Sequence, residues 1–337
     1  MIHPWAWVGW VGASLVALSK TRNPLHLVLM LLSIAIVNAL VGFRAELSLT
    51  PVSPLRFALF VVPLSAAFNA LTVHFGDTVL LRLPAWLPLL GGPVTLEALV
   101  YGALNGLVLA GILAAFTTLN QALPVRALVR LIPRAFYPVA VVTSIAVTFV
   151  PTTMRQFQQI REAQAVRGHR MRGLRDWVPL FMPLLVGGLE RALGLAEAMT
   201  ARGFASADDP EQDVRTRAAV VVGLVALLGG WLLRLAWGQE ALGLALMVAG
   251  SGLVLVTLWA VGRRVQHTTY RHEPWTGIDW AVALSAAAVL ALFLLPGLNR
   301  VALFYYPYPS LSWPSFDPVI GLISLGLLGP VLALVRR

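Results

Sequence analysis

The chain has 337 residues, of which 58% are hydrophobic and only 12% are charged. Soluble domains carry roughly 25% charged residues, so this composition excludes an ordinary soluble enzyme and a disordered protein. The lack of cysteine excludes a disulfide-stapled secreted module. The composition predicts an all-α polytopic membrane protein. In such a protein, the net charge of +10 indicates cytoplasmic loops rather than nucleic-acid binding.

Apolar segments close to the length of a membrane-spanning helix, about 20 residues, occur along most of the chain. Eight of them are predicted spans: 5–19, 24–43, 55–75, 98–120, 218–237, 241–262, 279–298 and 318–335. The first is short, and its start lacks the basic region and cleavage site of a signal peptide. The pattern predicts an N-terminal membrane bundle over residues 1–120 and a C-terminal one over residues 218–337, each with about four spans.

Two further apolar stretches, 135–154 and 177–200, lie between the predicted bundles. The segment that joins them is the most basic of the chain, with Arg155, Arg161, Arg167, Arg170, Arg172 and Arg175. Because positive charge marks the cytoplasmic side, the simplest topology has neither stretch crossing the membrane and both termini in the cytoplasm. Residues 121–217 would then form cytoplasmic or interfacial helices. The alternative is a pair of true spans with functional charges inside the bilayer.

The second stretch has the pattern of an amphipathic helix. Its apolar positions recur every three or four residues, at Trp177, Phe181, Leu184, Gly188, Ala192, Leu195 and Met199. Glu190, Arg191 and Glu197 also lie in it, and such charges are costly at the centre of a bilayer. A similar stripe, formed by Met154, Phe157, Ile160 and Ala163, continues the first stretch. We therefore expect two long amphipathic helices at the cytoplasmic leaflet.

The same seven-residue pattern lies at the C-terminal end of each of these two helices. Residues 162–168 and 197–203 share Glu-Ala-x-x-x-Arg-Gly, and the copies are 35 residues apart. A glycine after the last helical residue accepts the left-handed conformation, and a nearby arginine complements the negative helix end. Helix capping thus explains Arg-Gly but not the repeated Glu-Ala. Docking of two arginine tips into similar pockets on a pair of homologous soluble subunits is the other interpretation.

The two tips resemble the coupling motifs of the transmembrane T component (EcfT/CbiQ-like) of energy-coupling-factor (ECF) ABC transporters. Residues 146–151, before the first tip, are similar to the segment that precedes the first motif in this family. The Asn23-Pro24 turn and residues 68–71 at the end of the third predicted span also fit the family. The resemblance covers about residues 5–240.

The resemblance implies a non-catalytic scaffold without cofactors in a bacterial or archaeal inner membrane. It would link two ABC-type ATPases at the cytoplasmic face to a membrane-embedded S component that binds a micronutrient, either a vitamin or a metal ion. The ATPases can be one protein used twice or two different proteins. The implied ATPase-coupling residues are Glu162, Ala163, Arg167 and Gly168 in the first tip, and Glu197, Ala198, Ala201, Arg202 and Gly203 in the second.

Two features depart from the family pattern. Val166 stands where the first motif usually has alanine. The family usually has about one span after the second tip, whereas this chain has four predicted spans there. These helices could stabilise the fold, hold a substrate component or form a fused module, although they are too few for a complete S component.

Nucleotide hydrolysis through a P-loop is excluded, because Lys20 is the only lysine and no glycine-rich loop precedes it.

The alternative function is a membrane enzyme acting on lipid-linked substrates, with a metal on the acidic loop of Asp208, Asp209, Glu211 and Asp213. That loop lacks a second acidic cluster and has the pattern of a solvated linker. The scattered His169, His267 and His272 do not predict a metal site.

A secondary transporter would need charged or broken-helix sites at mid-membrane, and the predicted spans carry almost no charge. Glycine pairs in the C-terminal part, Gly223 with Gly229 and Gly243 with Gly250, favour close helix packing rather than a binding site.

Overall fold

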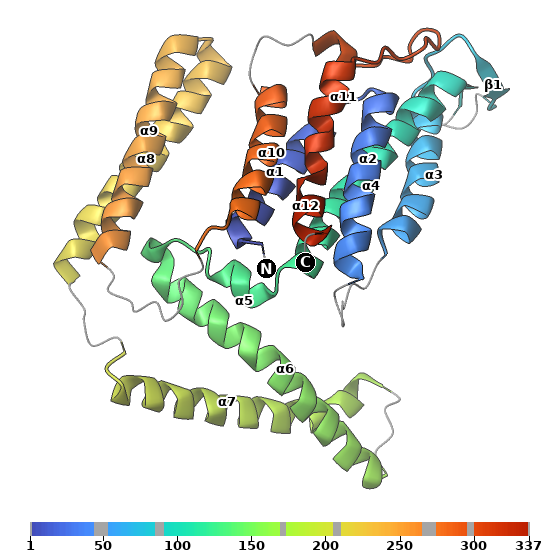
Figure 1. Cartoon of the computed structure of the whole chain (residues 1–337). Helices are drawn as coiled ribbons and strands as arrows, with labels where there is room; N and C mark the ends of the chain where they lie inside the picture. The colour runs from blue at the N-terminus through green and yellow to red at the C-terminus, as the bar shows by residue number, and fades with distance from the viewer. Residues whose placement is uncertain are drawn as a thin grey trace. The chain divides into compact units, whose positions relative to one another are not determined.

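The computed structural model describes residues 2–43, 53–84, 91–168, 173–204, 210–264, 274–294 and 300–335. Helices form almost all of the regular structure in these ranges (Figure 1). The strands within them, β1 (Val79–Arg82) and β2 (Pro93–Thr95), pair antiparallel as a small sheet. The expected all-α fold class is therefore confirmed.

The helices group into two compact units. One unit comprises Met1–Leu128 with Arg271–Arg337, and the other comprises Val129–Tyr270. This grouping differs from the predicted division into residues 1–120, 121–217 and 218–337. The last helices pack with the N-terminal ones, whereas residues 218–264 stay with the middle of the chain. The predicted division follows membrane topology and stays a prediction.

In the first unit, proline and capping residues mark where several helices begin. Its elements are α1 (Pro4–Lys20), α2 (Pro24–Gly42), α3 (Pro54–Thr72), α4 (Leu96–Ala122), α10 (Gly277–Leu294), η3 (Arg300–Leu303), α11 (Pro318–Ser324), η4 (Leu325–Leu328) and α12 (Gly329–Val335); α5 (Val125–Val129) lies at its boundary. Helices α1, α2, α3 and α11 each begin with proline after a capping side chain, from His3, Asn23, Ser53 and Asp317 respectively. Proline at the first helical position is pre-organised for a helix, and the cap accepts an otherwise unpaired backbone N–H.

The core of this unit joins the two ends of the chain. Trp10, Leu27 and Ile34 from the first two helices are fully buried in one cluster with Val289 and Leu327 from the C-terminal part. The indole N–H of Trp10 donates to the carbonyl oxygen of Leu327 at 2.7 Å. The C-terminal helices thus complete the N-terminal bundle instead of forming a bundle of their own.

Polar contacts tie the same segments together at one end of the unit. Asn23 is fully buried, and its side-chain amide donates to the carbonyl oxygens of Ala302 at 2.7 Å and Ser315 at 2.6 Å. The backbone N–H groups of Arg22 and Asn23 both donate to the carbonyl oxygen of Leu303. The turn between α1 and α2 is therefore held by residues 300–317, which we call the C-terminal strap.

Eight helices among the described residues are long and apolar enough to cross a membrane. They are α2, α3, α4, α10, Arg134–Val166, Val178–Ala201, Val214–Trp237 and Glu240–Arg263. Six of these match predicted spans. The predicted span 5–19 is a 17-residue helix, and 318–335 is broken into α11, η4 and α12. The two stretches that we predict to stay out of the bilayer also qualify, because length and composition alone do not distinguish an interfacial helix from a spanning one.

In the second unit, α8 (Pro210–Trp237) and α9 (Glu240–Arg264) form an antiparallel pair with glycines at the contact. A Cβ added to Gly223 would lie 3.0 Å from the carbonyl oxygen of Gly250, and one added to Gly230 would lie 2.6 Å from that of Gly243. Close packing through glycines is therefore confirmed, but not with the predicted partner Gly229, which faces open space. The contact glycines are seven residues apart on each helix, which is two helical turns.

The neighbouring glycines 229 and 230 provide a matched test of this packing. Gly230→Ala is expected to lower the free energy of unfolding by about 1–3 kcal/mol, since its methyl group would overlap backbone atoms of α9. Gly229→Ala is expected to be neutral or stabilising, because alanine favours the helix and the space around it is open. The measurement is thermal unfolding of each full-length variant in detergent micelles. Equal midpoints for the two variants would contradict the glycine contact.

Candidate coupling interface

Two long helices of the second unit, α6 (Tyr137–Val166) and α7 (Val178–Ala201), carry the residues that the sequence singled out. Short 3-10 turns precede them, η1 (Arg134–Phe136) and η2 (Leu174–Trp177). Neither helix is part of a core: no residue of α6 is buried, and Leu180 is the buried residue of α7. Both helices therefore present extensive side-chain surface, as an element that docks against partners or lipid does.

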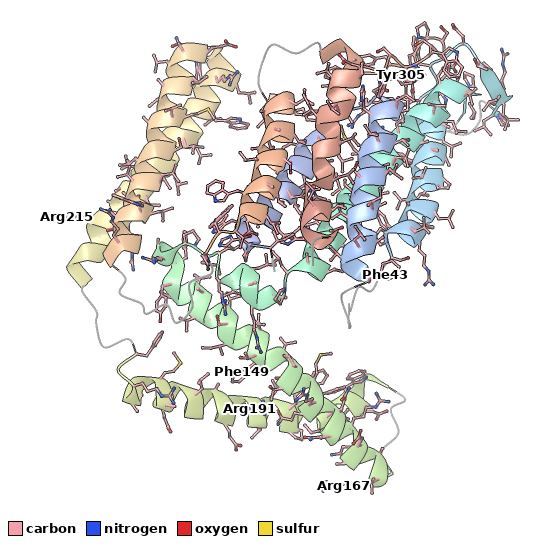
Figure 2. All side chains as sticks on the ribbon, in the orientation of Figure 1. Phe43, Phe149, Arg167, Arg191, Arg215 and Tyr305 are labelled. Carbon is pink, nitrogen blue, oxygen red and sulfur yellow. The ribbon has the colours of Figure 1, made fainter. Side chains whose placement is uncertain are left out.

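Helices α6 and α7 cross each other (Figure 1). At the crossing, the guanidinium group of Arg191 donates a hydrogen bond to the side-chain oxygen of Gln156 and lies 5.9 Å from the centre of the Phe149 ring. Gly187 allows this approach, because a Cβ there would lie 2.5 Å from the Gln156 side chain. Figure 2 shows Phe149 and Arg191 near this point and Arg167 at the far end of α6.

The crossing contact joins equivalent positions of the sequence repeat. Gln156 and Arg191 are 35 residues apart, which is also the separation of Arg167 and Arg202. Each tip arginine follows its crossing residue by 11 positions, which corresponds to about 16 Å along a helix. Each tip therefore lies at the end of its helix, 11 residues beyond its own residue in this side-chain contact. The sequence analysis did not predict the contact of Arg191 with Gln156 or the close approach at Gly187. Extending the 35-residue offset upstream of the motif would have paired Gln156 with Arg191.

The two tips have the same backbone geometry. Arg167 and Arg202 are the C-cap residues, with φ and ψ of −76° and 6° and of −90° and 8°. The glycines that follow, Gly168 and Gly203, have φ of 79° and 76°. Their N–H groups donate to the carbonyl oxygens of Ala165 and Thr200, as in a glycine-terminated helix. The predicted glycine caps are confirmed at both sites.

The remaining predicted site residues surround these caps on the protein surface. All nine of them are exposed: Glu162, Ala163, Arg167, Gly168, Glu197, Ala198, Ala201, Arg202 and Gly203. Within the described ranges, the side chains of Arg167 and Arg202 have no ion pair or hydrogen bond. The structure thus places two chemically similar arginines on separate arms and does not bring them together in one pocket.

Gly168 is a place where backbone conformation can be tested without side-chain overlap. Gly168→Ala is expected to fray the last turn of α6, because a left-handed alanine costs about 1–2 kcal/mol and no atom lies within 4 Å of its methyl group. Amide hydrogen exchange in residues 163–167 should rise about tenfold. Gly188→Ala in α7, where the space is also open and the backbone is helical, should leave exchange unchanged or slower. Unchanged exchange in Gly168→Ala would show that the left-handed cap does not stabilise the tip.

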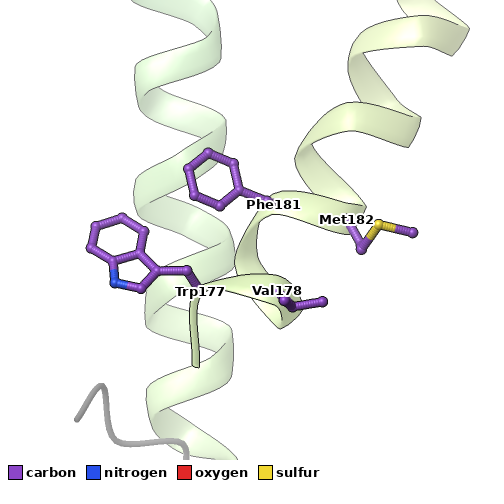
Figure 3. A pocket seen from close by; sticks show the side chains of 4 residues that line it. All are labelled: Trp177, Val178, Phe181 and Met182. Carbon is purple, nitrogen blue, oxygen red and sulfur yellow. The ribbon is translucent and has the colours of Figure 1, made fainter. Parts of the chain in front are cut away.

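The start of α7 carries an apolar hollow of about 400 Å³, lined by Trp177, Val178, Phe181 and Met182 (Figure 3). The Trp177 ring stacks on Phe181 at 5.7 Å and on Phe157 of α6 at 6.4 Å. This lining suits an apolar chain or helix and lacks the groups of a catalytic site. The predicted apolar stripe of α7 includes two of its residues, Trp177 and Phe181.

The other predicted candidates mostly lie outside the described residues. Asp208, Asp209, His169, His267 and His272 are among these, and the side chains of Glu211 and Asp213 are likewise outside. Among the described side chains, no group of three His, Cys, Asp or Glu residues could hold a metal ion.

Comparison with known proteins gives the family. The family model described as "CbiQ: Cobalt transport protein" matches residues 3–214, which include the first four helices of the chain, the α6–α7 crossing and both tips. The chain belongs to the CbiQ family. Its helices and this membership make it a multi-pass membrane protein of a transport family.

Several similar proteins share one name, "Energy-coupling factor transporter transmembrane protein EcfT". The one from Leuconostoc gelidum subsp. gasicomitatum is 28% identical over 212 residues, which cover 60% of this chain and 71% of the relative. The one from Exiguobacterium sibiricum is 30% identical over 128 residues, 36% of this chain and 41% of the relative. The one from Limosilactobacillus fermentum is 40% identical over 85 residues, 23% of this chain and 30% of the relative. The family match ends at residue 214, within the first turns of α8, so most of α8 and all later helices lie beyond it.

Proposed function

We propose that this chain is the transmembrane scaffold and coupling subunit of an ECF-type ABC importer. The observation that carries the proposal is the matched pair of exposed arginine tips on the crossed helices α6 and α7. An arginine offers five N–H donors in a planar fork, which suits a groove lined by carboxylates or carbonyl oxygens. Two equivalent tips, each 11 residues beyond one shared side-chain contact, suit two similar ATPase subunits beneath the membrane.

In this proposal, Arg167 and Arg202 insert into the ATPases, and Gly168 and Gly203 end the arms so that each arginine is at the tip. The repeated residues Glu162, Ala163, Glu197 and Ala198, with Ala201, form the surface around the arginines. When ATP binding or hydrolysis moves the ATPases, α6 and α7 act as levers about the contact between Gln156 and Arg191. The membrane helices receive this motion.

The orientation and the partners follow from the same proposal. Arginine tips that reach ATPases must lie in the cytoplasm, so residues 121–217 would lie there or at the membrane interface, and both termini would be cytoplasmic. The chain would be non-catalytic, since it has no P-loop and takes its energy from the ATPases. A separate S component in the bacterial or archaeal inner membrane would bind the micronutrient. The exposed apolar hollow at the start of α7 suits contact with an apolar surface of that subunit.

The test is to purify the full-length chain from its native membrane through an affinity tag. We expect two ATPase copies and one small membrane protein per chain, and ATP-dependent uptake after reconstitution in vesicles. A chain that purifies alone and shows enzymatic turnover of a lipid-linked substrate would support the alternative, in which the acidic loop of residues 208–213 binds a metal.

A further inference from the structure

A buried carboxylate without an opposite charge lies at the end of the first unit where α3 ends and α4 begins. Glu97, in the first turn of α4, is 0% exposed. Its Oε1 accepts a hydrogen bond from the backbone N–H of Thr78 at 3.1 Å, whereas its Oε2 is buried with no hydrogen-bond partner. In the part of the chain that the structure describes, no lysine, arginine or histidine pairs with it. Hydrogen bonds from Thr78 and from the Glu97 backbone stabilise the carboxylate in part, but a buried charge without an opposite charge beside it stays costly unless a proton or a cation compensates it.

A second unpartnered oxygen, on the C-terminal strap, lies at the same end of α4. The hydroxyl of Tyr308 is buried without a hydrogen-bond partner. The Tyr308 ring packs between Phe75 and Tyr101, with ring centres 5.8 Å and 5.9 Å away. The following residue of the strap, Pro309, accepts a hydrogen bond from the N–H of Asp77 at 2.9 Å. The strap therefore closes over the loop that covers Glu97.

The electrostatics and the backbone support a shared site. Burial raises the pKa of Tyr308, and the nearby Tyr101 and Glu97 raise it further, so its oxygen is a neutral ligand. Gly76 is required beside the carboxylate: its φ is 145°, and a Cβ would lie 2.5 Å from Oε2 of Glu97. Asn69, packed against Gly102 further along α4, supplies another buried oxygen without a partner at this end of the unit.

We infer that Glu97 and Tyr308 form a binding site for a small monovalent metal cation of the Na⁺ type. Hard cations prefer oxygen ligands, and one carboxylate with neutral oxygens balances a single positive charge. Divalent ions usually take more carboxylates than this site offers. The bound ion would link the C-terminal strap, which lies beyond the family match, to the start of α4. This site is independent of the coupling tips.

The experiment uses the purified full-length protein in detergent micelles with Na⁺ as the probe. Replacing about 100 mM N-methylglucamine chloride by NaCl at the same ionic strength should raise the unfolding midpoint by about 3 °C if Na⁺ exceeds its Kd tenfold. Glu97→Gln should abolish this shift, and Tyr308→Phe should reduce it. The matched control, Glu240→Gln at the exposed start of α9, should keep the full shift.

Several results would overturn the site. Equal midpoints of the unaltered protein in the two salts would mean that no Na⁺ binds at Glu97. A shift with CaCl₂ and none with NaCl would exclude a monovalent ion, and a full Na⁺ response in Glu97→Gln would place the ion elsewhere. If Glu97→Gln does not fold, the salt comparison on the unaltered protein and on Tyr308→Phe still decides the question.

Discussion

Reversing both tip charges, with Arg167→Glu and Arg202→Glu in one chain, is expected to abolish association with the ATPases while the protein stays folded in the membrane. Both side chains are exposed at the ends of α6 and α7, so their replacement removes no side-chain ion pair or hydrogen bond within the described ranges. Losing one partner of a buried charged contact at an interface costs about 2–5 kcal/mol. Two such losses should reduce co-purification of the ATPases by at least about 100-fold and bring uptake to background.

Graded variants separate docking from a general charge effect. Arg167→Lys with Arg202→Lys keeps the charge but loses the planar fork, so we expect an intermediate loss. A single reversal leaves one tip and should also be intermediate. Arg215→Glu, at the exposed start of α8, reverses a charge in the same unit and should leave association unchanged. Undiminished co-purification of the double charge reversal would refute the coupling assignment.

Replacing Asn23 is expected to have the largest effect on stability. Asn23→Ala should lower the free energy of unfolding by about 3 kcal/mol, because it removes the cap of α2 and leaves the buried carbonyl oxygens of Ala302 and Ser315 without their donor. The midpoint of thermal unfolding should fall by at least about 6 °C. The C-terminal strap would lose both side-chain hydrogen bonds that tie it to the turn between α1 and α2.

A conservative change distinguishes the strap from the helix cap. Asn23→Asp retains an oxygen that can accept from the N–H of Leu25, but it cannot donate to the strap carbonyls. We expect it to be at least as destabilising as Asn23→Ala. Asn120→Ala, at an exposed position near the end of α4, should change stability by less than about 0.5 kcal/mol. Unchanged unfolding of Asn23→Asp would show that these contacts contribute little.

Local signals account for what could be predicted along the chain. Apolar length and proline-cap starts located most of the helices, and Arg-Gly at the ends of α6 and α7 located both glycine caps. These local signals did not predict features that depend on contacts between helices distant in the sequence. The apolar segment 318–335 is long enough for one span, yet it breaks at η4, where a Cβ added to Gly326 would lie 3.1 Å from the Ser285 carbonyl oxygen on α10. Gly229 and Gly230 are adjacent glycines that the sequence alone does not distinguish, and only Gly230 contacts α9.

By itself, the sequence determined that this protein is a helical membrane protein with two arginine-tipped helices, because composition, helical periodicity and capping act over a few neighbouring residues. The tertiary structure decided which distant segments share a core. It placed the C-terminal helices and the strap against α1 and α2, joined Gln156 to Arg191, and brought Tyr308 to the loop over Glu97. These contacts depend on how packed helices bury apolar surface and pair buried polar groups, which no short stretch of sequence specifies.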